Sequence, residues 1–173
     1  MKKITTLFLF VFITVSCKNE TQKISKSATD AIKKETNSVL NNWHKAATEA
    51  NFENYFGLMD SVSVFIGTDA SENWTKKQFQ AFSKPFFDKG KAWDFKTLER
   101  NIYVNSSGDF VWFDELLKTW MGTCRGSGVL EKEGDTFKIK HYVLSVTIPN
   151  NDIQKVVKIV QKSDSIFLKK FNN

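Results

Sequence analysis

The sequence contains little cysteine and histidine, two residues of each in a chain of 173. If Cys17 is used in the N-terminal segment, Cys124 has no partner within the chain, which excludes a disulfide framework. Small residues surround Cys124, so we predict a packed, unreactive thiol. His44 and His141 have no nearby acids at metal-ligand spacing, and we therefore predict neither a metal site nor a cofactor.

Clustered charge, internal repeats and glycine-rich phosphate loops are also missing. The formal net charge is +6, but the lysines are spread along the chain and form no basic stripe. Such lysines are typical of solvated faces, and we exclude nucleic acid as a partner.

The N-terminal apolar run is too short to span a bilayer. It reads ITTLFLFVFITVSC, residues 4–17, and follows Met-Lys-Lys, as in a signal peptide. Its end, TVSC, resembles a bacterial lipobox in which the cysteine becomes the lipidated first residue, although Thr14 stands where leucine is common. We predict a lipoprotein signal peptide over 1–16, lipidation at Cys17 and a polar tether over 17–28. The protein would then be lipid-anchored to a bacterial membrane in the cell envelope, on the periplasmic or surface side; the alternative is a plain signal peptide.

Apolar periodicity predicts helices at both ends of the remaining chain. A helical stripe covers 29–50, a shorter one 51–59, and a third helix over 75–90 begins with a capping box of Thr75 and Gln78. Pro85 should kink this third helix or cut it short. Residues 61–69 alternate as a strand between the second and third helices, and 151–173 form an amphipathic C-terminal helix.

The region between Gly90 and Pro149 predicts four long strands joined by short turns. The strands cover 91–105, 110–122, 123–134 and 137–149, an antiparallel meander. Helices followed by such a sheet predict an α+β fold: a cone-shaped roll in which the curved antiparallel sheet wraps on the N-terminal helices. The open mouth of the cone would hold a small-molecule pocket.

Four stretches within 31–150 resemble the nuclear transport factor 2-like superfamily, in its SnoaL-like branch. They are IGTDASENW (66–74), VWFDE (111–115), RGSGVLEK (125–132) and FKIKHYVLSVTIPN (137–150), with Phe137 where the family usually has tryptophan. The resemblance implies a SnoaL-like domain over 29–150 and a homodimer formed through the sheet. The superfamily contains isomerases, cyclases, dehydratases and transport adaptors, so the fold does not define an activity.

Strand alternation brings three polar residues to neighbouring strands. We expect Glu115, Arg125 and His141 to meet inside the cone, with Asp114 facing out. One interpretation is structural, an Arg125–Glu115 pair capped by His141. The other is functional, with Arg125 binding an anionic or carbonyl group while His141 or Glu115 moves a proton.

The aromatic residues are predicted to form core for the most part. Trp93 and Tyr103 share a parity on their strand and are the aromatic candidates for the pocket wall, while His44 is expected at the helix edge. Three functions remain open: a membrane-tethered protein that binds a small, partly apolar ligand, an acid–base isomerase or cyclase using the same pocket, and a non-catalytic interaction module. Inward Glu115, Arg125 and His141 would favour the first two, whereas outward ones with an aromatic-filled cone would favour the third.

Overall fold

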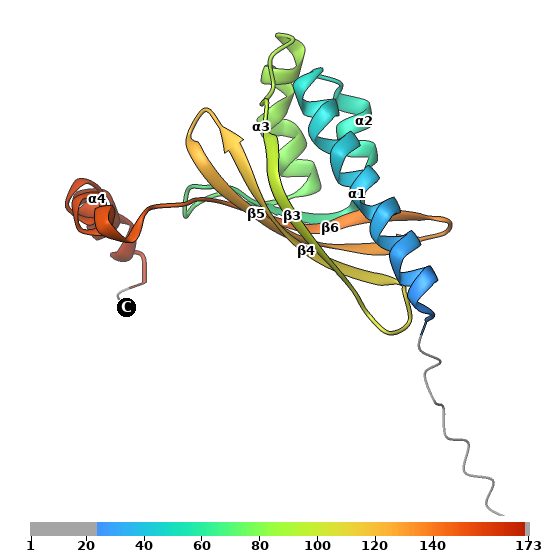
Figure 1. Ribbon diagram of the computed structural model, residues 1–173. Helices are drawn as coiled ribbons and strands as arrows, with labels where there is room; N and C mark the ends of the chain where they lie inside the picture. Colours follow the sequence, from blue (N-terminus) through green and yellow to red (C-terminus); the bar gives the residue numbers. More distant parts are fainter. Residues whose placement is uncertain (1–23, 172–173) are drawn as a thin grey trace, which may run out of the picture.

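The computed structural model describes residues 24–171 as a curved sheet with three helices on one face (Figure 1). The predicted signal peptide, most of the tether and Cys17 lie outside the described residues. None of the helices in the described range is both long and apolar enough to cross a bilayer.

The three packed helices are α1 (Lys26–Thr48), α2 (Phe52–Gly57) and α3 (Lys76–Asp88). The first begins where the Ser25 side chain accepts a hydrogen bond from the Ala28 N–H at 3.1 Å, so its first turn takes the last residues of the predicted tether. The predicted capping box of Thr75 and Gln78 starts α3. Pro85 does not cut α3 short, because the helix continues past it to Asp88.

Six strands form one sheet in the order β2-β1-β6-β5-β4-β3. Their bounds are β1 (Met59–Ile66), β2 (Asn73–Thr75), β3 (Lys96–Val104), β4 (Phe110–Thr119), β5 (Gly122–Glu133) and β6 (Thr136–Val146). The predicted meander is confirmed for β3 to β6, while β1 joins β6 in parallel. The short β2 and the late start of β3, at Lys96 in place of Lys91, were not predicted.

The core lies between the helices and the concave face of the sheet. Leu40, Trp43 and Ala47 of α1 meet Tyr142 of β6 and Phe113 of β4, all buried.

Burial on β4 alternates strictly, with Val111, Phe113, Glu115 and Leu117 inside. The predicted α+β roll is therefore confirmed, and Glu115 is the charged member of its inward-facing set.

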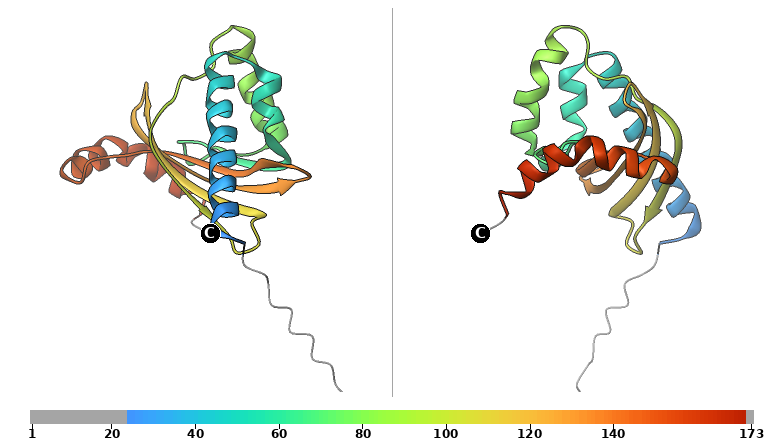
Figure 2. Two further views of the ribbon diagram at one scale, coloured as in Figure 1. Left: turned by 45° about the vertical axis from the view of Figure 1, so that its right-hand side comes forward. Right: turned by 90° about the vertical axis from the view of Figure 1, so that its left-hand side faces the viewer.

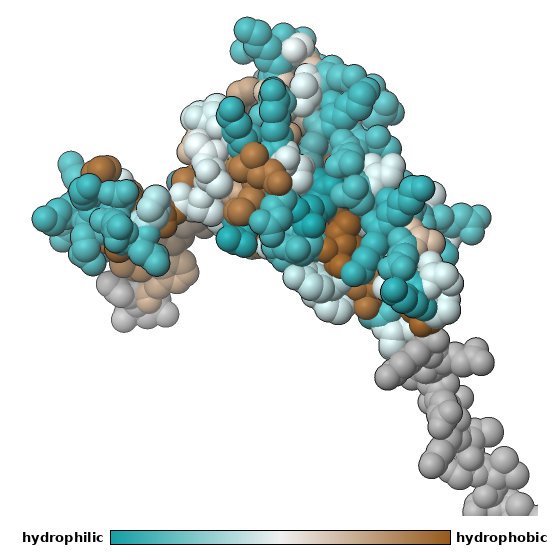
Figure 3. All heavy atoms as spheres, viewed as in Figure 1, coloured by the Kyte–Doolittle hydropathy of each residue, from teal (hydrophilic) through white to brown (hydrophobic). Residues whose placement is uncertain are grey.

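The C-terminal helix α4 (Ile153–Leu168) follows a short 3-10 turn at Asn150–Asp152 and has no buried residue. It projects from the end of β6 beside the body of the molecule (Figure 2). Apolar side chains of α4 are exposed on the surface. Further apolar side chains, from the body of the molecule, are visible over β3 on an otherwise hydrophilic face (Figure 3). The amphipathic helix was predicted, but its apolar stripe meets no core.

Candidate ligand-binding site

Glu115 lies at the centre of the concave face with no exposed surface. Its Oε1 accepts hydrogen bonds from the His44 Nε2 at 2.9 Å and from the Tyr142 hydroxyl at 3.0 Å. Its Oε2 accepts the Arg100 Nε at 2.9 Å and lies 2.8 Å from the Arg100 Nη2. Three hydrogen bonds and one further ion-pair contact from protein groups therefore occupy both oxygens of the carboxylate.

Arg100 is held as completely as the carboxylate it binds. Its Nη1 donates to the side-chain oxygens of Asn37 and Asn41, each at 2.7 Å, and its Nη2 donates to the Thr97 hydroxyl at 3.1 Å. The buried ion pair is thereby anchored to α1 and β3 at once. We call the set Glu115, Arg100, His44 and Tyr142 the carboxylate network.

The carboxylate network keeps Glu115 ionised. Burial by itself raises the pKa of Glu115, but the hydrogen bonds from His44 and Arg100 and the charge of Arg100 outweigh it, so the pKa lies below its ordinary value. Burial raises the pKa of Tyr142 well above its ordinary value, and the adjacent Glu115 charge raises it further. Tyr142 therefore remains a hydrogen-bond donor to the ionised Glu115.

Sequence reasoning identified Glu115 and its inward orientation but assigned it the wrong partners. His44, expected at the helix edge, is buried beside Trp43 and lies four residues after Leu40, in phase with the apolar stripe of α1. Arg100 could have been found by counting outward from the β3–β4 turn, since Val104 opposes Val111 and Arg100 opposes Glu115. The helical phase and the hairpin register were the two missed signals.

The predicted meeting of Glu115, Arg125 and His141 is wrong. Arg125 lies opposite Leu116 on the outer face of the sheet, with 55% of its side chain exposed, 3.9 Å from Asp114. Gly126, the neighbour of Arg125, is the residue opposite Glu115. Asp114 does face outward as predicted.

A β-bulge explains the error at His141. Ile139 and Tyr142 both face the core, and the pairing with β5 passes from Ile139 directly to His141, so that Lys140 is the extra residue. Lys140 contacts Asp60 and Glu131, each at 3.1 Å. The extra residue reverses the parity of everything after it, and His141 leaves the face that alternation assigned to it.

The two aromatic residues predicted for the pocket wall, Trp93 and Tyr103, lie on different sides of the sheet. Tyr103 lies on the outer face, 42% exposed and stacked on Trp112 with ring centroids 5.7 Å apart. Trp93 precedes β3 and lines a pocket on the concave side. The shared parity of Trp93 and Tyr103 does not exist, because the strand begins at Lys96. Cys124 is a free, buried thiol, as predicted.

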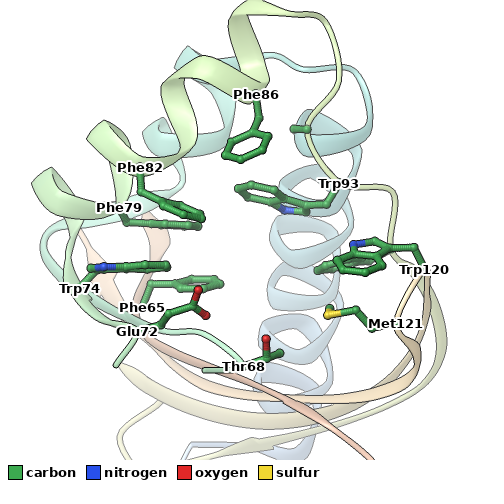
Figure 4. A pocket seen from close by; sticks show the side chains of 12 residues that line it. Phe65, Thr68, Glu72, Trp74, Phe79, Phe82, Phe86, Trp93, Trp120 and Met121 are labelled. Carbon is green, nitrogen blue, oxygen red and sulfur yellow. The ribbon is translucent and has the colours of Figure 1, made fainter. Parts of the chain in front are cut away.

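The pocket that contains Trp93 opens between α3 and the β4–β5 turn and has a volume of about 230 Å³. Its lining, which we call the aromatic pocket, is shown in Figure 4 and consists of Phe65, Thr68, Glu72, Trp74, Phe79, Phe82, Phe86, Ala92, Trp93, Phe95, Trp120 and Met121. No member of the carboxylate network belongs to it. The pocket and the buried charges are therefore separate features of the concave side.

The aromatic pocket is built of nearly parallel rings. Phe79 of α3 stacks on Phe65 at 3.9 Å, on Trp74 at 5.7 Å and on Trp93 at 5.7 Å between centroids, with interplanar angles of 16°, 6° and 19°. Phe82, one turn further along α3, stacks on Trp74 at 4.4 Å. Trp120, 83% exposed at the tip of the β4–β5 turn, faces these rings from the opposite side (Figure 4).

Groups that could bind a metal do not converge in the described part of the chain, residues 24–171, where no three histidine, cysteine, aspartate or glutamate side chains lie together. The charged residue of the aromatic pocket is Glu72 alone. The arrangement can therefore enclose an apolar or aromatic molecule, whereas the ionised Glu115 lies behind a closed set of hydrogen bonds.

A family model for the SnoaL-like domain matches residues 36–149, which include the three packed helices, apart from the start of α1, and the whole sheet. The chain belongs to the SnoaL-like domain family. No curated protein matches the chain significantly.

Solved structures share the fold of this SnoaL-like domain at low identity. An NTF2-like protein of unknown function from Pseudomonas putida is 11% identical with a TM-score of 0.59, covering 70% of this chain and 91% of its own. The association domain of C. elegans CaMKII is 18% identical with a TM-score of 0.58, covering 70% of this chain and 100% of its own. A domain of unknown function with a cystatin-like fold from Nostoc punctiforme is 13% identical with a TM-score of 0.60, covering 83% and 98%. Such identities establish the NTF2-like cone and no activity.

Proposed function

We propose that this SnoaL-like domain binds a small, largely apolar molecule in the aromatic pocket, without chemistry. The observation that carries the proposal is an open cavity of about 230 Å³ walled by stacked aromatic rings. Apolar pockets with a few polar groups are the usual sites of small ligands. The carboxylate network supports binding over catalysis, because Glu115 would have to break hydrogen bonds to His44, Arg100 or Tyr142 before moving a proton.

A thermal-shift screen of residues 24–173 against apolar and aromatic compounds, neutral and charged, tests this function. At least one compound should raise the melting temperature of the parent by mass action on the folded state. Phe82→Ala should reduce that shift, because the partly exposed Phe82 ring lines the pocket. The control is Leu98→Ala, a partly exposed apolar residue of β3 outside the pocket, which should keep the shift. A parent that no compound stabilises would contradict the proposal.

Pairing of two copies through the outer face of the sheet is a second proposed function. Trp112, 43% exposed, and Tyr103 present stacked rings there, beside Arg125 and Asp114. His141 also lies outward, so most of the residues predicted for the cone belong to this face. Exposed aromatics with arginine are typical of interface centres.

Analytical ultracentrifugation over a range of concentrations tests the pairing. The parent should sediment as a dimer and Trp112→Lys as a monomer, because the substitution places two charges in the interface. Trp120→Lys, an equal change at the exposed tip of the β4–β5 turn, is the matched control and should remain a dimer. A parent that stays monomeric at high concentration would remove the proposal.

Lipid anchoring at Cys17 remains a proposal supported by the sequence: the apolar run that ends in Ser16–Cys17 and the polar residues beyond it. It would hold the domain at a bacterial membrane, with the pocket facing the cell-envelope space. Fractionation of cells that express the full chain should find the parent with membranes and Cys17→Ala in the soluble fraction. Membrane retention of Cys17→Ala would exclude anchoring through this residue.

A further inference from the structure

Glu72 is the one charged side chain of the aromatic pocket, in a protein whose formal net charge is positive. The described structure records no ion pair for Glu72 with residues 24–171. Its Oε2 accepts the Asp69 N–H at 3.1 Å, which holds the side chain against the β1–β2 loop. Its carboxylate points toward the space between the two aromatic walls (Figure 4).

Aromatic faces surround this carboxylate. Each ring carries partial negative charge on its faces, and tryptophan is the strongest of these cation acceptors. Trp74, Trp93 and Trp120 all line the pocket, and its lining contains no lysine, arginine or histidine. The Glu72 carboxylate and the faces of the rings therefore both favour a positive charge in the pocket.

We propose that the ligand of the aromatic pocket is an organic monocation, an alkylammonium group with apolar substituents. The substituents would be buried against the rings while the positive charge lies over the ring faces and near Glu72. An anionic ligand would be repelled by Glu72, and a neutral apolar ligand would leave that carboxylate unpaired beside it. This inference rests on the proposed binding function and adds the charge of the ligand.

Titration calorimetry of residues 24–173 with choline and with its neutral carbon isostere, dimethylbutanol, measures the contribution of the charge alone. Benzyltrimethylammonium extends the series with a larger apolar group. The cations should bind at least about tenfold more tightly than the neutral isostere, the range of a partly desolvated cation–aromatic contact. Cations that bind no more tightly than dimethylbutanol, or that do not bind, would overturn the inference. The proposed function would fail only if no compound of the thermal-shift screen stabilised the parent.

Two variants assign the effect to the pocket. Glu72→Gln keeps an oxygen for the Asp69 N–H but removes the charge, and it should weaken the cations about tenfold without changing the neutral isostere. Trp120→Ala removes an exposed ring, so that the fold is spared, and should also weaken the cations. Glu35→Gln, which removes an exposed charge from α1, is the control and should bind as the parent does. Unchanged cation affinity in both Glu72→Gln and Trp120→Ala would contradict the site.

The same chemistry could come from a free ammonium compound or from a choline lipid head group. Co-sedimentation of residues 24–173 with phosphatidylcholine vesicles, compared with phosphatidylglycerol vesicles, separates these sources. Because the pocket is a concave cavity of about 230 Å³, we expect it to bind the free cation. The protein should then sediment with neither kind of vesicle through the pocket. Sedimentation of the protein with phosphatidylcholine vesicles that is abolished by free choline would overturn the assignment to a free compound.

Discussion

At the scale of single residues, two arginines of this domain have opposite environments. The side chain of Arg100 is 4% exposed and is bound to Glu115 and three further side chains. The side chain of Arg125 is 55% exposed and lies 3.9 Å from Asp114. Both are strand arginines near an acid, and their energetic contributions should differ because one pair is desolvated and the other is screened by water.

Arg100→Met should lower the free energy of unfolding by about 3–5 kcal/mol, since it leaves the Glu115 charge buried without its partner. Adding Glu115→Leu should restore much of that loss. Arg125→Met is the matched control, expected to change stability by less than about 1 kcal/mol. Urea unfolding followed by circular dichroism measures all three, and equal costs at the two arginines would show that the carboxylate network is not a buried ion pair in solution.

The acid sensitivity of the fold should depend on Glu115. Its pKa is lower in the folded protein than its ordinary value, so folding favours the ionised form, and this stabilisation is complete above the ordinary pKa and is lost as pH falls through the folded pKa. Glu115→Gln should be less stable than the parent at neutral pH, and the difference should shrink on acidification. Urea midpoints measured from about pH 7 down to about pH 3 test this.

Glu35→Gln provides the comparison for that titration, because Glu35 is exposed on α1. Its urea midpoint should follow that of the parent at every pH. A constant gap between parent and Glu115→Gln over the whole range would mean that the Glu115 charge does not titrate with unfolding.

At the scale of elements, β5 leaves space for the side chains of the carboxylate network. Gly126 faces inward opposite Glu115, and a Cβ at this position would lie 2.2 Å from the Tyr142 hydroxyl oxygen and 3.0 Å from the Glu115 Cγ. The glycine is therefore required by the close approach of β4 and β6 side chains across β5. Gly126 and Gly128 thus leave the middle of the inward face of β5 without side chains, between the buried Cys124 and Leu130.

Gly126→Ala should destabilise the domain by about 1–3 kcal/mol, because the added methyl group displaces Tyr142 or Glu115 from their hydrogen bond. The control is Gly57→Ala at the end of α2, where a Cβ meets nothing within 4 Å. That variant should melt like the parent. Calorimetry of both proteins checks the pair, and a Gly126→Ala protein as stable as Gly57→Ala would show that the network can shift aside.

At the scale of the whole molecule, the packed body and α4 differ in how they are held. The body encloses a continuous core between α1 to α3 and the sheet, while α4 has no buried residue. Helices of this kind contribute little to the stability of the body to which they are attached.

Removal of residues 151–173 should therefore leave the melting temperature within about 2 °C of the parent. Leu40→Ala, in the core on α1, should by contrast cost about 2–5 kcal/mol. Differential scanning calorimetry compares the two. A large fall in melting temperature on truncation would mean that α4 packs against the body in solution.

The sequence by itself determined the fold class and most of the elements, although not the short β2 or the start of β3. Apolar periods, the capping box and the turns were sufficient for the helices, the meander and the α+β roll, because each depends on local spacing. The inward orientation of Glu115 followed from regular alternation along β4. The family resemblance, carried by short motifs, was confirmed by the match over 36–149.

Only the tertiary structure decided which residues meet. A single extra residue at Lys140 turned His141 outward. Two of the four inward residues of β5 are glycines, so hydrophobicity identified that face poorly and Arg125 was misplaced. Glu115 is bound by residues from α1, β3 and β6, and the aromatic pocket combines the β1–β2 loop, α3 and the β4–β5 turn. Contacts between segments so far apart along the chain depend on strand register and helix placement, which no local pattern records.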